Sequence, residues 1–113
     1  MIVKGKIWIE TDFGLKIGLG RALLLERINA LGSISEAARE LKIPYRRAWG
    51  IIRDMNENSP KQIVLKEVGG KSGGKSELTD YGKRIVELFN EVDDCFKKFS
   101  KSESDRFSGW EEF

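Results

Sequence analysis

The chain has 113 residues, of which 40% are hydrophobic and 34% charged, enough for one domain with a core and a polar surface. It has no histidine and a single cysteine, Cys95, which excludes an internal disulfide, a cysteine zinc cluster and the most common general base. We therefore expect no enzyme, no cofactor and no metal site. No apolar run approaches the ~20 residues that span a bilayer, and the N-terminus MIVKGKIWIETD is not a signal peptide, so we expect a cytoplasmic protein without membrane contact.

The net charge of +2 is divided unevenly along the chain. Residues 1–78 contain 14 Lys and Arg against 9 Asp and Glu, whereas residues 79–113 contain 6 against 9. The basic part is the one that would face a polyanion, although this modest excess does not decide the function by itself.

The first third of the chain predicts a strand, a loop and a helix. Residues 4–11 alternate partly between polar and apolar side chains and favour a strand, and residues 12–20 contain glycines that favour a loop. A helix is expected from about residue 21 to residue 31, ended by Gly32. Its buried stripe would consist of Leu24, Ile28 and Leu31.

Residues 33–57, SISEAARELKIPYRRAWGIIRDMNE, predict two short amphipathic helices separated by a few residues. Ser35 is the expected N-cap of the first, over residues 36–42, and Pro44 is expected in the first turn of the second, which would run to about residue 58. With Ile34 as the first position of a helix-turn-helix frame, small or apolar residues fall at the positions that this motif buries. These residues are Ala37, Ala38, Leu41, Ile43, Ala48 and Ile51.

The second of these helices has an apolar side and a basic side. The apolar side consists of Ala48, Ile51, Ile52 and Met55. The opposite side and its flanks carry Tyr45, Arg46, Arg47, Trp49, Gly50 and Arg53. Because arginine binds guanine edges and phosphates, and glycine lets the backbone approach a partner, we expect this side to contact DNA. The alternative is an ordinary solvated charged face, and Trp49 is expected to pack partly where a wing meets the helix.

Two serines open the first helix of this pair. Ser33 and Ser35 lie where backbone N–H groups at a helix N-terminus can bind a phosphate, so both are candidate DNA contacts. Capping of the helix alone is the equal alternative.

The segment after the second helix predicts a hairpin, with strands at residues 63–68 and 76–78 around a glycine-rich turn. Lys71, Ser72 and Lys75 in this turn are candidate contacts to the minor groove or the DNA backbone. GGKSGGKS, residues 69–76, also satisfies the P-loop pattern GxxxxGK[ST]. Only one helix and a tail follow, so the parallel strands of that fold are missing, and nucleotide binding is the least favoured interpretation.

The last part of the chain predicts a long helix over residues 79–100, capped by Thr79, and a polar tail over residues 101–113. Apolar residues recur along the helix at alternating spacings of three and four, as in a coiled-coil seam. Packing within the chain must use the first part, and beyond Leu88 we expect a two-fold dimer interface. The candidate interface residues are Tyr81, Ile85, Leu88, Phe89, Val92, Cys95, Phe96 and Phe99.

From about residue 20 to residue 99 the sequence resembles the DNA-binding domain of the ModE family of molybdate-responsive regulators, relatives of the LysR-type winged helix. The resemblance is carried by GRALLLERINALGSISEAAREL, then IPYRRAWGIIRDMNE, then VGGKSGGKSELTDYG. It implies sequence-specific DNA binding as a dimer, with Ser33, Ser35, Tyr45 to Arg47 and Gly50 at the major groove and Lys71 to Lys75 at the wing. Pro44, where the family often has serine, is a departure that would alter the base contacts.

Full-length members of that family carry C-terminal oxyanion-binding domains, whereas here only about a dozen residues follow the closing helix. The resemblance therefore does not extend to molybdate sensing, and a separate effector-binding protein is the partner through which an effector would act.

The sequence thus predicts a mainly α fold with a small β wing: a winged helix-turn-helix domain over residues 1–100, closed by a long dimerisation helix. The predicted function is sequence-specific binding of double-stranded DNA by a homodimeric transcriptional regulator. A winged-helix module that binds another protein is the main alternative.

Overall fold

The computed structural model describes residues 1–66 and 75–110, and it is mainly helical. These residues form four helices and two antiparallel two-stranded sheets. The elements are β1 (Trp8–Glu10), β2 (Lys16–Gly18), α1 (Leu19–Leu31), α2 (Ile34–Glu40), α3 (Tyr45–Glu57), β3 (Val64–Lys66), β4 (Ser76–Leu78) and α4 (Asp80–Arg106).

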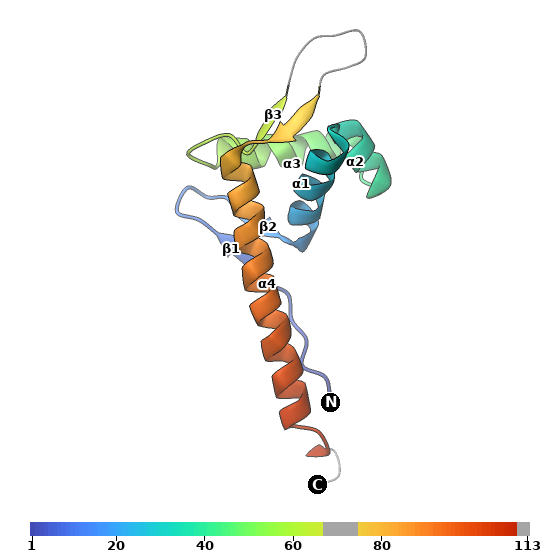
Figure 1. Ribbon diagram of the computed structural model, residues 1–113, viewed down its shortest axis with the longest axis vertical. Helices are drawn as coiled ribbons and strands as arrows, with labels where there is room; N and C mark the ends of the chain where they lie inside the picture. Colours follow the sequence, from blue (N-terminus) through green and yellow to red (C-terminus); the bar gives the residue numbers. More distant parts are fainter. Residues whose placement is uncertain (67–74, 111–113) are drawn as a thin grey trace.

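The first three helices and both sheets form a head, from which α4 projects as a stalk (Figure 1). The molecule measures 66 × 30 × 19 Å. Its radius of gyration is 17.5 Å, whereas a compact domain of this length has about 13 Å. The C-terminal half of α4 therefore lies outside the head, and the N-terminal segment runs beside it (Figure 1).

The core of the head is centred on α1, which packs against α2, β2, β4 and α4. Removal of these apolar side chains from water is the main contribution to the stability of the head. The largest fully buried side chains are Leu15, Ile17, Leu24, Leu25, Ile28, Met55, Ile63 and Phe89. Among the described residues, no helix is both long enough and apolar enough to cross a membrane.

The N-terminal region differs from the sequence prediction. Only residues 8–10 of the expected strand are paired, and residues 16–18 of the expected loop form its partner strand, with Ile9 opposite Ile17. The glycines of this segment suggested a loop, but Gly14, with a φ of 94°, serves only the turn between the two strands. Leu15 and Ile17 are buried in the core of the head, and this burial holds β2 in place.

Helix α1 ends as predicted, at Gly32, which adopts a φ of 70° and donates its N–H to Ile28 O. It begins at Leu19, two residues before the predicted start, because β2 leads directly into it. The prediction of a buried Leu31 was wrong: this side chain is 37% exposed at the last position of the helix.

The N-cap of α2 is Ser33 and not Ser35, so that prediction was wrong. Ser33 has an extended backbone, and its Oγ accepts a hydrogen bond from Glu36 N at 3.1 Å. Ser35 is already the second helical residue and is exposed. Pro44 likewise lies at the N-cap of α3 and not within its first turn.

The second sheet pairs β3 with β4, with Val64 opposite Leu78. The predicted strand 76–78 is confirmed, and of the predicted strand 63–68 the described residues Val64–Lys66 form β3. Residues 67–74, which include Lys71 and Ser72, lie outside the described residues. Ser76 is buried in β4 and α4 starts only at Asp80, so the chain after GGKSGGKS lacks the immediate helix that a P-loop requires.

Helix α4 is capped by Thr79, as predicted, through a hydrogen bond from Gly82 N to Thr79 Oγ1 at 2.9 Å. It continues to Arg106, so the expected polar tail is helical for its first six residues. Pairs one turn apart, Lys101 with Asp105 and Glu103 with Arg106, support this last part of the helix.

Gly82 sets how closely α4 approaches the hairpin. A Cβ atom at this position would lie 2.3 Å from Ile63 O, whereas a Cβ at Gly20 in α1 would have nothing within 4 Å. We expect Gly82→Ala to lower the free energy of unfolding by about 1–3 kcal/mol, because the backbone of residue 63 must move. Gly20→Ala should raise it by up to about 1 kcal/mol. Urea unfolding monitored by circular dichroism gives the free energy of unfolding of each variant. Equal effects of the two substitutions would contradict this packing.

Candidate nucleic-acid interface

Helices α2 and α3 are joined by residues 41–44 and pack closely through small side chains. Ala37, Ala38 and Ala48 are between 0% and 2% exposed. The partly buried residues Leu41, Ile43 and Ile51 pack against the same core. The residues that the sequence assigned to a buried helix-turn-helix frame are therefore confirmed as interior contacts.

The turn between these helices depends on Lys42. Its φ is 58°, in the left-handed region that favours glycine, and the next residue, Ile43, donates its N–H to Ala38 O at 2.8 Å. A residue in this conformation reverses the chain within a few residues. The turn thus holds α3 at a fixed angle on α2.

The side of α3 that faces away from the core is cationic. Tyr45, Arg46, Arg47, Gly50 and Arg53 are all exposed. Arg21, Arg27, Arg84 and Arg106 each pair with a carboxylate, but no ion pair within the described residues involves Arg46, Arg47 or Arg53. Three guanidinium groups of one helix therefore have their hydrogen-bond donors available to a ligand.

Gly50 lies in the middle of this exposed side. A Cβ atom there would meet nothing within 4 Å, so packing within the chain does not require glycine. Glycine inside a helix costs about 1 kcal/mol relative to alanine. The residue instead leaves the centre of the exposed side flat, so that the backbone can approach a partner.

Trp49 lies between the exposed side of α3 and the hairpin. Lys66 Nζ of β3 stands 4.1 Å from the centroid of its ring, and the ring of Tyr45 meets it edge to face at 6.0 Å. These contacts confirm that Trp49 packs where β3 meets α3. Its Nε1 is buried and has no hydrogen-bond partner among the described residues.

The remaining candidate contacts surround α3. Ser33 Oγ is occupied in capping α2, whereas Ser35 and Pro44 are exposed. Lys75 is exposed directly before β4. Lys71 and Ser72 lie outside the residues that the structure describes.

Asn56, near the end of α3, holds the hairpin strand β3. Its Oδ1 accepts hydrogen bonds from Ile63 N at 2.8 Å and Val64 N at 3.2 Å, and its Nδ2 donates to Val64 O at 3.3 Å. The other strand is fixed to the end of α1, because Ser76 N donates to Gly32 O at 3.0 Å. The hairpin is thus anchored through β3 to α3 itself and through β4 to the end of α1.

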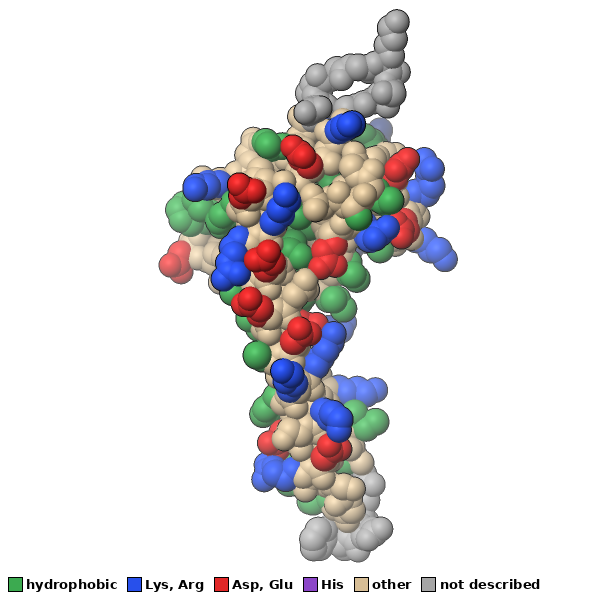
Figure 2. All heavy atoms as spheres, viewed as in Figure 1, with side chains coloured by type: hydrophobic (Ala, Val, Ile, Leu, Met, Phe, Trp, Pro, Cys, Tyr) green, Lys and Arg blue, Asp and Glu red, His purple; other side chains and the backbone are tan. Residues whose placement is uncertain are grey.

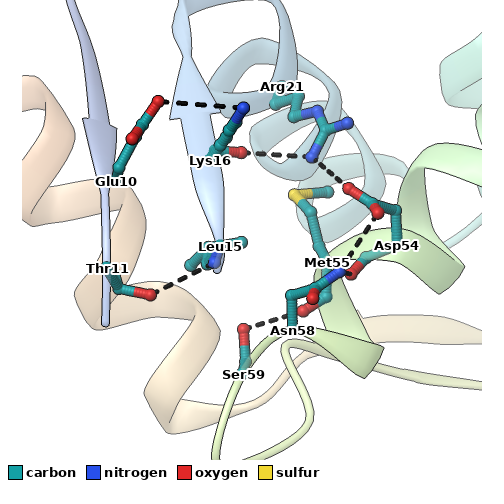
Figure 3. A network of polar contacts seen from close by, with 9 residues as sticks. All are labelled: Glu10, Thr11, Leu15, Lys16, Arg21, Asp54, Met55, Asn58 and Ser59. Atoms are coloured by element: carbon teal, nitrogen blue, oxygen red, sulfur yellow. Dashed lines mark hydrogen bonds and ion pairs between the residues drawn. The ribbon is translucent and has the colours of Figure 1, made fainter. Parts of the chain in front are cut away.

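A second polar network fixes α3 to the start of α1 (Figure 3). Arg21 Nη1 donates to Asp54 Oδ2 at 2.8 Å and to Lys16 O at 3.1 Å. Asn58 Nδ2 donates to Asp54 O at 2.8 Å at the end of α3. No local pattern in the sequence indicates a role for these residues or for Asn56, because their partners lie farther along the chain than such patterns reach.

The charge on the face of the head that Figure 2 shows is mixed. Figure 2 shows acidic and basic side chains interspersed over the described residues on one side of the head. Charge on this face therefore does not mark an interface, and the distinguishing feature of α3 is a group of arginines that have no ion pair within the described residues.

The candidate dimer residues of α4 divide into two groups. Ile85 and Phe89 are only 7% and 0% exposed within the single chain. Side chains without accessible surface cannot be buried further against a second copy, so these two belong to the chain's own core. Tyr81 packs against the same core, and Phe96 is half-buried. Leu88, Val92, Cys95 and Phe99 are exposed.

Comparison with characterised proteins finds similarity over most of the chain. It is 39% identical over 85 residues, 75% of its length, to the molybdenum transport protein ModE of Azotobacter vinelandii, and covers 32% of that protein. It is 41% identical over 70 residues, 62% of its length, to the DNA-binding transcriptional dual regulator ModE of Escherichia coli, covering 27% of it. It is 35% identical over 80 residues, 71% of its length, to the molybdenum-pterin-binding protein MopB of Rhodobacter capsulatus, covering 30%.

The chain thus spans about a third of the length of the curated relatives that it matches. No family model matches it. The relatives support the resemblance to ModE-type proteins that the sequence predicts. Their names are those of regulators, a transport protein and a binding protein and not of enzymes, in agreement with the prediction that this chain is not an enzyme.

Removal of the Asn56 side chain tests how the hairpin is held. Asn56→Ala leaves two backbone N–H groups of β3 without an acceptor, so we expect the free energy of unfolding to fall by about 1–3 kcal/mol. Asn56→Asp keeps the acceptor and should cost less. Urea unfolding gives the stabilities, and amide hydrogen exchange at Ile63 and Val64 should accelerate in the alanine variant. Unchanged exchange at both amides would contradict the anchoring role.

Proposed function

We propose that this chain is a sequence-specific DNA-binding protein that acts in transcriptional regulation, with α3 as the recognition helix of a winged helix-turn-helix. The observation that carries the proposal is the exposed side of α3, where Arg46, Arg47 and Arg53 have no ion pair within the described residues. Surface cations of a monomer are commonly neutralised by nearby carboxylates. A group of arginines without such partners on one helix face indicates a surface that binds a polyanion.

In this proposal α2 and α3 form the helix-turn-helix, and the β3–β4 hairpin forms the base of the wing. The close packing of the alanines at the α2–α3 contact and the left-handed Lys42 support the first assignment. The two anchors of the hairpin, on α1 and α3, support the second. A wing fixed in this way reaches the DNA flanking the bases that the recognition helix contacts.

The exposed side of α3 would enter the major groove. Arg46 and Arg53 are the candidates for bidentate contacts to guanine O6 and N7, and Arg47 and Tyr45 for phosphate or thymine methyl contacts. Gly50 lets the helix axis approach the base edges. Ser35 and Pro44 flank this surface, and Lys75 is the described wing residue that would neutralise a phosphate.

The function of the relatives supports the same conclusion. The Escherichia coli protein is named a DNA-binding transcriptional regulator, and the Haemophilus influenzae relative a transcriptional regulator. The match covers about a third of the length of these proteins.

We further propose that the chain binds DNA as a homodimer through the exposed apolar residues of α4. A two-fold dimer doubles the phosphate contacts and presents two recognition helices to a palindromic site. The exposed Leu88, Val92 and Phe99, which are 37%, 40% and 56% exposed, support this assignment.

A winged-helix module that docks on another protein is the alternative for the same surface. The two hypotheses differ in their dependence on salt, because each phosphate contact releases a condensed counterion. Affinity for duplex DNA should fall by about 10³-fold between 50 and 200 mM salt if six or more phosphates are contacted. Absent or salt-independent binding, measured by fluorescence anisotropy, would favour the protein-docking hypothesis.

Two substitutions separate base recognition from phosphate contact. Arg46→Ala should weaken binding to the cognate sequence by about 1–3 kcal/mol and binding to random duplex much less, because a base contact is lost. Lys75→Ala should weaken both about equally and reduce the slope of affinity against salt. Urea unfolding of both variants controls for stability. Equal losses on cognate and random DNA for both variants would sink the assignment of Arg46.

A further inference from the structure

A cavity lies between the first sheet, the start of α1 and the middle of α4 (Figure 1). Its volume is about 450 Å³, which is within the range of sites that bind small molecules. None of the candidate DNA contacts among the described residues lines it. Most of its side chains are apolar, and these are Ile7, Trp8, Leu19, Phe89 and Phe96. A ligand in this cavity would contact the head and the stalk at the same time.

The aromatic residues of the cavity come from β1 and from α4. Trp8 is 59% exposed, although its Nε1 donates a hydrogen bond to Glu10 Oε1. Phe96 is half-buried, and Phe89 is fully buried and closes the cavity toward the core. Because the faces of aromatic rings carry partial negative charge, such a lining favours ligands with apolar surface and with positive charge.

One carboxylate belongs to this mostly apolar lining. Among the described residues of the cavity wall the acidic one is Asp93, and its side chain is only 17% exposed. Its Oδ2 lies 3.0 Å from Nζ of Lys97, whose side chain is 69% exposed. The ammonium group of this pair is therefore largely in water, whereas the carboxylate is not. A pair with one solvated partner contributes little to stability, so a cationic ligand can replace Lys97 beside Asp93 at small cost.

Two positive features also border the cavity, but both are weaker. Lys6 is exposed, so its long side chain can carry its charge into water. The N-terminus of α1, at Leu19, carries only about half a positive charge. The full charge of the Asp93 carboxylate is screened less by solvent, because its side chain is mostly covered. The balance of charge therefore favours a cation.

We propose that this cavity binds a small organic cation, an ammonium ion with alkyl or aryl substituents. Its positive group would lie against Asp93, and its apolar part would lie between Trp8 and Phe96. Aromatic rings beside a carboxylate suit a substituted ammonium group, which is attracted by charge and by ring faces and needs few hydrogen bonds. An inorganic cation would lose its water without gaining oxygen ligands from this apolar lining.

The cavity is separate from the surfaces that the proposed function uses. On α4, Phe89 and Asp93 follow Leu88 and Val92 of the proposed dimer interface by one residue each, so they lie about 100° further around the helix. The described candidates for DNA contact lie on α2, α3 and the hairpin or directly beside them. The inference therefore goes beyond the proposed function and does not rest on it.

Titration of the full, isotope-labelled chain with benzyltrimethylammonium, followed by two-dimensional amide NMR, tests the site. We expect saturable shifts of the amides of Gly18 and Gly20, which line the cavity, and none at Gly50 on α3. The dissociation constant should be about 1 mM, because the probe has few atoms. Benzyl alcohol and benzenesulfonate keep the ring but are neutral and anionic, and they should bind roughly tenfold more weakly.

Substitutions identify the groups that recognise the charge. Asp93→Asn keeps the size of the side chain and should weaken binding of benzyltrimethylammonium about tenfold, while binding of benzyl alcohol stays within about twofold. The matched control is Asp94→Asn, an exposed neighbour that does not line the cavity, and it should change neither constant. Trp8→Leu keeps an apolar side chain without the ring and should weaken binding of the cation about 3- to 10-fold. Urea unfolding of each variant controls for stability.

Four results would overturn the proposal. Tighter binding of benzenesulfonate than of benzyltrimethylammonium would assign the cavity to anions through Lys6. Equal losses in Asp93→Asn and Asp94→Asn would remove the role of the carboxylate. Shifts confined to residues outside the cavity, or no saturation at about ten times the expected dissociation constant, would exclude the site itself. Because no DNA is present, none of these results bears on whether α3 binds DNA.

Discussion

The structure depends on the close contact between α2 and α3. Ala37 and Ala48, both fully buried, have side chains small enough for the two helices to approach one another, and the left-handed Lys42 makes the short turn between them possible. A larger side chain at either alanine would separate the helices, because protein interiors have no spare volume. The direction of the arginine-bearing side of α3 follows from this contact, since the opposite side, with Ile52 and Met55, is held in the core.

The hairpin and the stalk are positioned by polar contacts around that core. Asn56 fixes β3 to α3, and the carbonyl of Gly32, which accepts from Ser76 N, fixes β4 to the end of α1. Thr79 caps α4 and also donates its hydroxyl to Gln62 O at 2.6 Å, so that the long helix leaves the head at the base of the hairpin. Helix α3, the strands β3 and β4 and the start of α4 are therefore joined by direct hydrogen bonds to one another or to α1.

Local patterns in the sequence were sufficient for the helices of the head and for the frame of α2 and α3, because their buried positions repeat every three or four residues. They did not distinguish Ser33 from Ser35 as the cap, since both are serines and only the backbone conformation decides. The three-residue strand β2 was missed among glycines, and the contact of Val3 with Ser104 joins residues 101 apart in sequence. Periodicity in α4 predicted an apolar seam, but it did not distinguish the residues that pack against the chain's own core, Ile85 and Phe89.

Selection of bound sequences from a pool of random duplex DNA tests the central claim most directly. If α3 recognises base edges and two copies bind together, the selected pool should converge on a palindrome whose half-sites are about 34 Å apart, close to one helical turn. Repetition with Arg46→Ala should then lose the preference at one position of each half-site and keep the spacing. A pool without enrichment at physiological salt, or one that converges on a single unrepeated site, would contradict the account.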